Sequence, residues 1–412
     1  MFRRRWLLLI LPVLGAWIAA LHGSPGHGAP TATDSFFQTY WKLPVPPQGS
    51  PPPEFHPLAA SLNPQNCAAC HPRQFADWVT SLHSHAMGPG VTGQLVDFLK
   101  RKPEDAASCE NCHAPLSEQH EWLTDANGHG RANARFAPEL RAAAVSCAAC
   151  HVRGFHRNGP PRNPQHPSGI AWTGLPAKPH GEVFRTPHFE QSQFCAPCHQ
   201  FGPGNDVNGK PLENTLEEWR RSVYARQGVS CQVCHMPERR HLWRGIHDPA
   251  MVRRGVSIAF QGPVQSGSAL TATLTVSNTR VGHDFPTYIT PQVLVRMEQQ
   301  DQLGRSIPGT RREWRIGRTI DFTSAGVEEL SDTRIPPGES RSFSYRGRIQ
   351  STATRLRAWI QVYPDHYYTG FYHQVLAQRD RSSNSKRQLL EALTHSQRTS
   401  YLLFDRRVEL GR

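Results

Sequence analysis

The chain has 412 residues, a formal net charge of +13 and a hydrophobic content of 38%. This length permits two or three domains with more than one core, and the composition is that of a loop-rich globular protein rather than a disordered one. Lysine and arginine are dispersed along the chain without a dense basic helix, so the charge does not indicate nucleic acid as a partner. Histidine is the unusual residue: there are 22, and histidine serves mainly as a metal ligand or a proton carrier.

The N-terminal segment has the order of an export signal. Three arginines near the start precede an apolar run from Trp6 to Leu21, and small residues follow. The run is short for a membrane span, so residues 1–29 are predicted to be a cleaved signal peptide, with an uncleaved N-terminal anchor as the alternative. Residues 30–57 are rich in proline and are predicted to form an arm or linker. The protein is therefore expected in the periplasm or otherwise outside the cytoplasm.

The ten cysteines define the class of protein, because all ten fall in C-x-x-C pairs and a histidine follows each pair at once. The pairs are Cys67/Cys70, Cys109/Cys112, Cys147/Cys150, Cys195/Cys198 and Cys231/Cys234, and the histidines are His71, His113, His151, His199 and His235. A zinc site usually takes two such pairs, which five pairs cannot satisfy evenly, and redox disulfides do not need the histidine. Covalent attachment of haem c does need this arrangement: the thiols bond to the haem vinyl groups, and the histidine is the proximal iron ligand. The sequence predicts five covalently bound haem c groups.

Residues 58–250 contain all five motifs and are predicted to form one haem-binding domain. The 169 residues from Cys67 to His235 provide about 34 per haem, too few to enclose each haem in a core of its own. The haems are therefore expected to share a core and to lie against one another. The secondary structure should consist of short helices and turns, with helices over residues 73–83 and 211–228.

The residue pattern changes near Val256. No cysteine follows, and segments in which apolar and polar residues alternate begin. Alternation is clear in residues 269–278, 291–298, 340–349 and 355–364, and the first of these places Leu270, Ala272, Leu274 and Val276 on one face. Residues 256–378 are predicted to form an antiparallel β-sandwich. Residues 379–412 are predicted to add a helix over 385–397 and a strand over 400–404. The expected fold is thus a mostly α, loop-rich multihaem cytochrome domain followed by a β-sandwich, α+β overall.

Each haem iron has a sixth position, and its ligand decides the function. A second histidine there gives a low-spin haem suited to electron transfer, whereas an empty position admits a substrate. Histidines at fixed places beside the motifs are the candidates for distal ligands. These candidates are His83, His120, His188, His247 and His283, with His85, His241 and His156 as alternates. His241 and His247 compete after the fifth motif, with a slight preference for His247, and the remaining histidines, His180 among them, are assigned to haem propionates or the surface.

The region from about residue 60 to 250 resembles the multihaem cytochromes of the cytochrome c554 type. The resemblance rests on "CAACHPRQFADWVTSLHSHA", in which Trp78, Ser81 and His83 follow the first haem motif, and also on "CQVCHMP" and "GHDFPT". It implies that His83 rather than His85 is a distal ligand. It also implies that "GHDFPT" begins an immunoglobulin-like domain, which favours His283. The sequence departs from the namesake in having five motifs where the namesake has four, so the pairing of haems with ligands stays open.

Electron transfer between redox partners is the function that the sequence favours, along closely packed haems in the periplasm. The partners are expected to be other cytochromes or a quinol-oxidising membrane complex, to which the β-sandwich would dock, and association with a membrane is a further expectation. The alternative is an enzyme with one open iron that converts nitrite or hydroxylamine. Pentahaem nitrite reductases resemble the chain in haem count, but their active-site motif ends in lysine, and no C-x-x-C-K occurs here. No catalytic residue is predicted.

Overall fold

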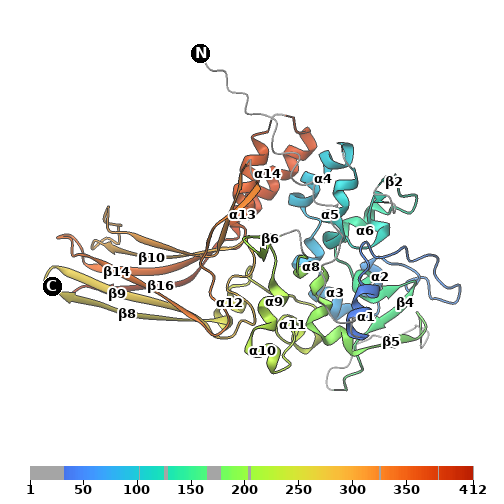
Figure 1. The fold of residues 1–412 in the computed structure, drawn as a ribbon, viewed down its shortest axis with the longest axis horizontal. Helices are drawn as coiled ribbons and strands as arrows, with labels where there is room; N and C mark the ends of the chain where they lie inside the picture. The colour runs from blue at the N-terminus through green and yellow to red at the C-terminus, as the bar shows by residue number, and fades with distance from the viewer. Residues whose placement is uncertain are drawn as a thin grey trace, which may run out of the picture. The chain divides into compact units, whose positions relative to one another are not determined.

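The computed structural model describes residues 32–411, apart from residues 102, 125–128, 165–177, 203–205, 324–325 and 379. The predicted signal peptide lies outside the described residues. The chain divides into two compact units: unit 1 comprises 1–198, 230–243 and 376–392, and unit 2 comprises 199–229, 244–375 and 393–412. The units therefore interleave along the chain, whereas the sequence suggested a single boundary between residues 250 and 256 (Figure 1).

The first of these boundaries falls inside the fourth haem motif. Cys198 is the last residue of the first segment of unit 1, and His199 is the first residue of unit 2. The sequence had instead placed Cys198 and His199 together in one haem-binding domain over residues 58–250. The physical reason is the pairing of the chain after the motif, because Phe201 N–H donates to the Glu213 carbonyl at 2.8 Å, and both residues belong to unit 2.

Unit 1 consists of short helices with a few short strands. Its α-helices are α1 Ala32–Tyr40, α2 Pro64–Ala68, α3 Pro72–Trp78, α4 Pro89–Arg101, α5 Pro103–His113, α6 Pro138–Ala142, α7 Cys147–His151 and α11 Cys231–His235, and α8 Ala196–His199 ends at its boundary. Its strands are β1 Trp122–Thr124, β2 Gly130–Ala132, β3 Val152–Arg153, β4 His156–Gly159 and β5 Val183–Arg185. Its 3₁₀ turns are Leu82–His85, Ser117–Gln119, Pro187–Glu190, Ser192–Phe194 and Pro237–Arg239. Proline is the first residue of five of these α-helices, where its missing N–H costs nothing and its fixed φ suits the helix.

Two of the predicted helices are shorter than the sequence suggested. The helix predicted over 73–83 ends at Trp78, because the hydroxyls of Thr80 and Ser81 donate to the carbonyls of Asp77 and Trp78 at 2.8 and 2.7 Å. The helix predicted over 211–228 is broken into α9 Thr215–Arg220 and α10 Val223–Arg226. Ser222 causes the break by accepting a hydrogen bond from Ala225 N–H as the N-cap of α10.

Unit 2 is built mainly from antiparallel strands. A four-stranded sheet has the order β11-β10-β15-β16, and a three-stranded sheet has the order β14-β9-β8. The strands of unit 2 are β6 Asp206–Val207, β7 Lys210–Pro211, β8 Val256–Ser266, β9 Ala269–Asn278, β10 Gln292–Gln300, β11 Arg312–Ile316, β12 Arg318–Thr323, β13 Gly326–Asp332, β14 Ser340–Arg348, β15 Arg355–Tyr363 and β16 Tyr401–Glu409; its remaining helices are α12 Pro249–Gly255 and α13 His366–Leu376. The four alternating segments of the sequence are all strands, and the final strand is longer than predicted.

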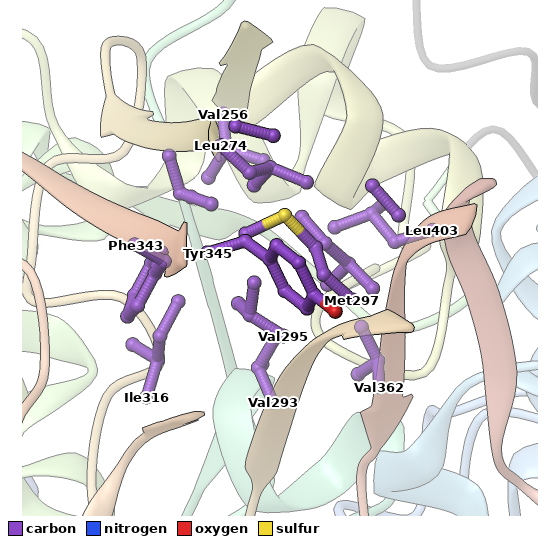
Figure 2. Close-up of a cluster of buried hydrophobic side chains, with 14 of the residues drawn as sticks. Val256, Leu274, Val293, Val295, Met297, Ile316, Phe343, Tyr345, Val362 and Leu403 are labelled. Carbon is purple, nitrogen blue, oxygen red and sulfur yellow. The ribbon is translucent and has the colours of Figure 1, made fainter. Parts of the chain in front are cut away.

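The two sheets share one hydrophobic core. Leu274 and Tyr345 come from the three-stranded sheet, Val295 and Met297 come from the four-stranded sheet, and all four are almost fully buried. Figure 2 shows Tyr345 and Met297 directed toward each other within this cluster. The predicted face of β9 is confirmed, since its alternate residues from Leu270 to Val276 are buried. The alternation in the sequence therefore identified the sheet faces correctly.

Segments distant in sequence complete each unit. Arg318 of β12 is buried, donates to the carbonyls of Val207, Lys210 and Pro211, and pairs with Glu329 at 2.7 Å. These bonds attach the segment between the fourth and fifth motifs to the strands of unit 2.

The helix α14 Ser383–Arg398 begins in unit 1, where it packs against α4 at Gly93 and Ser385 Oγ donates to the Gly93 carbonyl at 2.6 Å. A Cβ at Gly93 would come within 3.0 Å of Gln388, so glycine permits this close approach.

Replacing Leu274 by alanine should destabilise the protein by about 2–5 kcal/mol, because it leaves a cavity in the shared core of the two sheets. Thr271→Ala, on the exposed face of the same strand, is the matched control and should change stability little. Urea denaturation followed by far-ultraviolet circular dichroism measures both. Equal stabilities of the two variants would contradict the assignment of the core face.

Candidate functional site

The C-x-x-C-H motifs occupy single helical turns. In α5, α7, α8 and α11 the histidine is the last residue of the helix, and in the first motif α2 contains Cys67. Residues i, i+3 and i+4 lie on one face of a helix, so both thiols and the imidazole of one motif face the same side. No disulfide joins any of the ten cysteines, all of which lie in the described residues. Within those residues, no three His, Cys, Asp or Glu side chains converge as they would around a bound zinc ion.

The fourth motif, like the first, is divided between elements. Cys198 and His199 lie in α8, whereas Cys195 precedes that helix and caps the 3₁₀ turn Ser192–Phe194. Cys195 nevertheless has helical backbone angles, with φ of −89° and ψ of −18°. The Cys198 N–H donates to the Cys195 carbonyl at 3.4 Å, which closes the turn between them. The half-buried Cys198 thus keeps its predicted place on the same turn as Cys195, and its bond to a haem stays a prediction.

The motifs of unit 1 are close neighbours. The thiols of Cys67 and Cys147 are hydrogen-bonded to each other, and this bond raises the pKa of Cys147 and lowers that of Cys67. The thiols of Cys195 and Cys231 are paired in the same way, which raises the pKa of Cys195. Cys112 Sγ lies 4.0 Å from the carbonyl oxygen of Pro197. The first motif is thus beside the third, the fourth beside the fifth, and the second beside the fourth.

Several proximal histidines are held by the ring nitrogen that would not bind iron. His113 Nδ1 lies 2.6 Å from the Ala86 carbonyl oxygen, and His151 Nδ1 lies 2.8 Å from that of Asn158. A carbonyl oxygen only accepts hydrogen bonds, so Nδ1 carries the proton and Nε2 keeps its lone pair. Metal-binding histidines have this arrangement, since the second ring N–H is anchored by an acceptor. The proximal histidines therefore fit the role that the motifs predict.

The same test separates the candidate distal histidines. Nδ1 is held by the Arg239 carbonyl in His241 at 3.0 Å, by the Asp284 carbonyl in His283 at 2.9 Å, and by Thr186 Oγ1 in His188 at 2.6 Å. Where a carbonyl oxygen accepts from Nδ1, that nitrogen carries the proton and Nε2 keeps its lone pair, as in the proximal histidines. Phe36 stacks on the ring of His188, with centroids 4.0 Å apart.

His120 and His247 fail this test, so the preference that the sequence gave them finds no support in the geometry. His120 is fully buried, and its Nε2 lies 2.9 Å from the Ala114 carbonyl oxygen. His247 Nε2 lies 3.1 Å from both carboxylate oxygens of Asp365. In both histidines Nε2 is already engaged by the protein, although Nδ1 of His120 is buried without a hydrogen-bond partner among the described residues.

His151 and His241 have the spacing of two ligands on opposite sides of one metal. Their ring centroids are 6.2 Å apart. A metal–imidazole bond of about 2 Å, as measured for zinc, and roughly 1 Å from nitrogen to ring centre give about 6 Å across the pair. Burial lowers the pKa of His151 to about 4 and also lowers that of His241. Both rings are therefore neutral at pH 7, which is the form that binds metals.

Asp77 holds the backbone that presents His241. Its carboxylate accepts from Arg240 Nε at 2.7 Å, from Arg240 Nη2 at 2.5 Å and from the His241 backbone N–H at 3.0 Å. The segment is strained, with φ of 53° at Glu238 and 58° at Arg239, and such conformations cost about 1–3 kcal/mol each. The buried carboxylate of Asp77 therefore stabilises the loop conformation that places His241 opposite His151.

In unit 2, His283 lies in the electrostatic environment of His199. Burial lowers the pKa of His283, and His199 is among the charges that act on it. The His283 loop is fixed, because Glu218 accepts from Asp284 N–H at 3.2 Å and from Thr287 Oγ1 at 2.9 Å. Arg334 pairs with the buried Glu218 at 2.7 Å. This network holds His283 in place near the fourth motif's histidine.

The other candidate histidines have different surroundings. His83 is half-buried, and its ring lies 4.7 Å from that of Trp243, whereas His85 is exposed and its Nδ1 lies 2.9 Å from the Ser81 carbonyl oxygen. His156 is exposed in β4. His180 was assigned to propionates or the surface, yet it acts on the pKa of His71, and its Nδ1 is buried without a hydrogen-bond partner among the described residues. His180 is thus a candidate that the sequence did not single out.

A buried cation also fits a bound haem. Arg153 stacks over the ring of Tyr40 at 3.9 Å and donates to the carbonyls of Tyr40 and Ala149. Its Nη2 is buried without a hydrogen-bond partner within the described part of the chain. Haem propionates are carboxylates, which are the acceptors that such a guanidinium nitrogen lacks. The donor set near the third motif therefore suits a haem with a propionate directed at Arg153.

Comparisons with known proteins find a cytochrome family model and a cytochrome structure that are similar to the chain. The family model "Cytochrome c554 and c-prime" matches residues 66–152. The chain is similar in structure to a penta-heme cytochrome c552 from Thermochromatium tepidum, with a TM-score of 0.60 and 15% identity over 86% of this chain and 100% of that one. A structural genomics target, SoR45, matches 26% of this chain and 70% of that one at 12% identity, but its TM-score of 0.14 supports no argument. No curated protein matches.

The fold and the family match together support a multihaem c-type cytochrome. They support covalently bound haem c and a haem-based role in electron transfer. The helices and antiparallel sheets agree with a cytochrome domain accompanied by a β-rich domain. None of the helices in the described ranges is both long and apolar enough to span a membrane.

Asp77→Asn should loosen the loop that carries His241, because the neutral amide no longer offers two charged oxygens to Arg240 and the His241 backbone. A high-spin signal should appear in the electron paramagnetic resonance spectrum of the oxidised protein. Glu190→Gln is the matched control, since Glu190 pairs with the adjacent Arg239 at 2.5 Å but is exposed. If Asp77→Asn and Glu190→Gln give the same low-spin spectrum as the native protein, Asp77 has no positioning role.

Proposed function

We propose that the protein is an exported pentahaem c-type cytochrome that transfers electrons along closely packed, mostly bis-histidine haems between redox partners. The observation that carries this proposal is the set of five C-x-x-C-H motifs, with neighbouring thiols from different motifs in contact. Cys67 contacts Cys147, and Cys195 contacts Cys231. Haems attached at such neighbouring thiols would lie edge to edge or stacked, as electron transfer among them requires.

The ligand assignment rests on the ring spacing of His151 and His241 and, for the other two pairs, on the electrostatic effect of one histidine on the other. We assign His151 and His241 to the third haem and His199 and His283 to the fourth. His180 is the candidate partner of His71 at the first haem. The candidate distal ligands of the second and fifth haems are His83, His85 and His188. We do not propose His120 or His247 as ligands. The β-rich part of unit 2 would be the immunoglobulin-like domain that the resemblance implies, contributing His283.

When bound, the haems supply one-electron carriers whose potentials the protein tunes. The chain's own residues orient the axial ligands and exclude water around them. The ring of Phe189 is stacked 5.3 Å from that of His151, and Tyr40 donates to the Cys150 carbonyl at 2.7 Å. Arg153 would neutralise a propionate. Together these residues keep the third haem in an apolar, firmly packed setting.

Export and partners belong to the same proposal. The apolar run near the N-terminus supports export to the periplasm, and c-type haem is attached outside the cytoplasm. Other cytochromes or a quinol-oxidising membrane complex are the proposed redox partners, with association at the membrane as part of that contact. The dispersed basic residues support compensation of haem propionates rather than nucleic acid binding.

The purified holoprotein should contain five haems per chain. The pyridine haemochrome assay combined with the intact mass of the protein measures this number. Fewer than five attached haems would contradict the proposal, because every motif carries both thiols and the histidine. Cys147→Ser, Cys195→Ser and Cys198→Ser should each weaken the attachment of one haem and leave the others in place.

His241→Ala should convert one low-spin haem to high spin, since the variant lacks the proposed distal ligand of the third haem. His247→Ala is the matched control six residues away and should leave all haems unchanged in spin state, because Asp365 engages its Nε2. Electron paramagnetic resonance of the oxidised proteins distinguishes the two. The opposite pattern would restore His247 as the ligand.

A second candidate function is supported by the contacts of His120. His120 was expected to serve a haem next to the second one, but its Nε2 is engaged by Ala114, so that neighbouring haem would lack this ligand, and an open iron there would admit a small nitrogen compound. If the protein is such an enzyme, nitrite or hydroxylamine should shift a high-spin signal of the native protein. An all-low-spin spectrum that neither compound alters would support electron transfer alone.

A further inference from the structure

We infer that Glu213 is a positioning and tuning residue that lowers the reduction potential of the fourth haem by holding His199 with a charged hydrogen bond. This inference rests on the proposed function, since it requires a haem iron ligated by His199. Glu213 Oε1 lies 2.9 Å from His199 Nδ1, and the Glu213 side chain is 17% exposed. The partly buried carboxylate of Glu213 therefore accepts a hydrogen bond from the Nδ1–H of His199.

The backbone around Glu213 is fixed to the residues that follow His199. The Glu213 carbonyl accepts from Phe201 N–H at 2.8 Å. Gln200 and Asn214 form an antiparallel bridge, and Gln200 Nε2 donates to Asn214 Oδ1 at 3.0 Å. These bonds join residues 200–201 to residues 213–214. The backbone of Glu213 therefore cannot move away from that of residues 200 and 201 without breaking these bonds.

The partner of His199 differs in charge from those of the other proximal histidines with described Nδ1 contacts. His113 and His151 are held by the neutral carbonyls of Ala86 and Asn158. A carboxylate draws the Nδ1 proton away from the ring more strongly than a carbonyl does, so the imidazole donates more electron density through Nε2. Greater donation stabilises ferric iron relative to ferrous iron. The fourth haem should therefore have a lower potential than the same haem with a neutral partner.

The consequence for electron transfer concerns the order of reduction. The thiol of Cys195 in the fourth motif contacts that of Cys231 in the fifth, and Pro197 contacts Cys112 of the second. The fourth haem would then have two neighbours, and a lowered potential would place the electron preferentially on one of them at partial reduction. Glu213 would thus determine whether an electron resides on the fourth haem or on its neighbours at the second and fifth motifs.

The test is the variant Glu213→Gln, which keeps a hydrogen-bond acceptor of the same size and removes the charge. Glu217→Gln is the matched control, because Glu217 lies in the same unit, has a side chain that is 45% exposed and pairs with Arg220. Spectroelectrochemical titration of the holoproteins should show one haem whose ferrous-to-ferric ratio at fixed potential rises at least tenfold in Glu213→Gln. A tenfold change corresponds to an upward shift of about 59 mV for one electron. The g-values of one low-spin signal should change in parallel.

Glu213→Asp keeps the charge one methylene further from the ring and should shift the potential less than Glu213→Gln. This second variant keeps the test decisive if Glu213→Gln loses haem. Equal potentials in Glu213→Gln, Glu217→Gln and the native protein, with five haems attached, would overturn the inference and leave the proposed function standing. A native protein with fewer than five haems would instead overturn the proposed function, and the inference with it.

Discussion

The placement of two cysteines and a histidine on one helical turn is the constraint on which unit 1 depends. Covalent attachment requires both thiols and the imidazole on the same side, and a helical turn brings residues i, i+3 and i+4 there. Longer helices are not needed for this purpose, and α7 and α11 end with the histidine. Unit 1 has two small apolar clusters, one around Leu116 and one around Leu95, and the haems would add to this packing.

The histidines are selected by their second ring nitrogen rather than by their place in the sequence. His241 and His283 have Nδ1 anchored by a carbonyl, like the proximal His151. His120 and His247 have Nε2 engaged instead. The two groups cannot be distinguished from neighbouring residues in the chain, because the acceptor can come from a different segment. For His247 the acceptor is Asp365, which lies 118 positions further along the chain.

Buried charge has a structural role in each unit. In unit 1, Asp77 offsets the strain of the loop around His241 through three hydrogen bonds. In unit 2, Glu218 and Arg334 form a buried pair that fixes the loop of His283. Leaving either partner of such a pair alone in the interior is costly, so the loops have one well-defined position. That rigidity is what a ligand-bearing loop needs.

The sequence by itself determined the class of the protein. The five C-x-x-C-H motifs identify the thiols and proximal histidines, and the alternation in residues 269–278 identifies a sheet face, because both depend on residues close together in the chain. The tertiary structure decided the interleaved units, with a boundary just after Cys198, and it supplied the contacts on which the proposed preference for His241 over His247 and the proposed roles of Asp77 and Glu213 rest. Asp77 meets Arg240 from 163 positions away in the chain. Only folding brings such residues together, so no local pattern could have predicted that Asp77 fixes Arg240 or that Asp365 engages the Nε2 of His247.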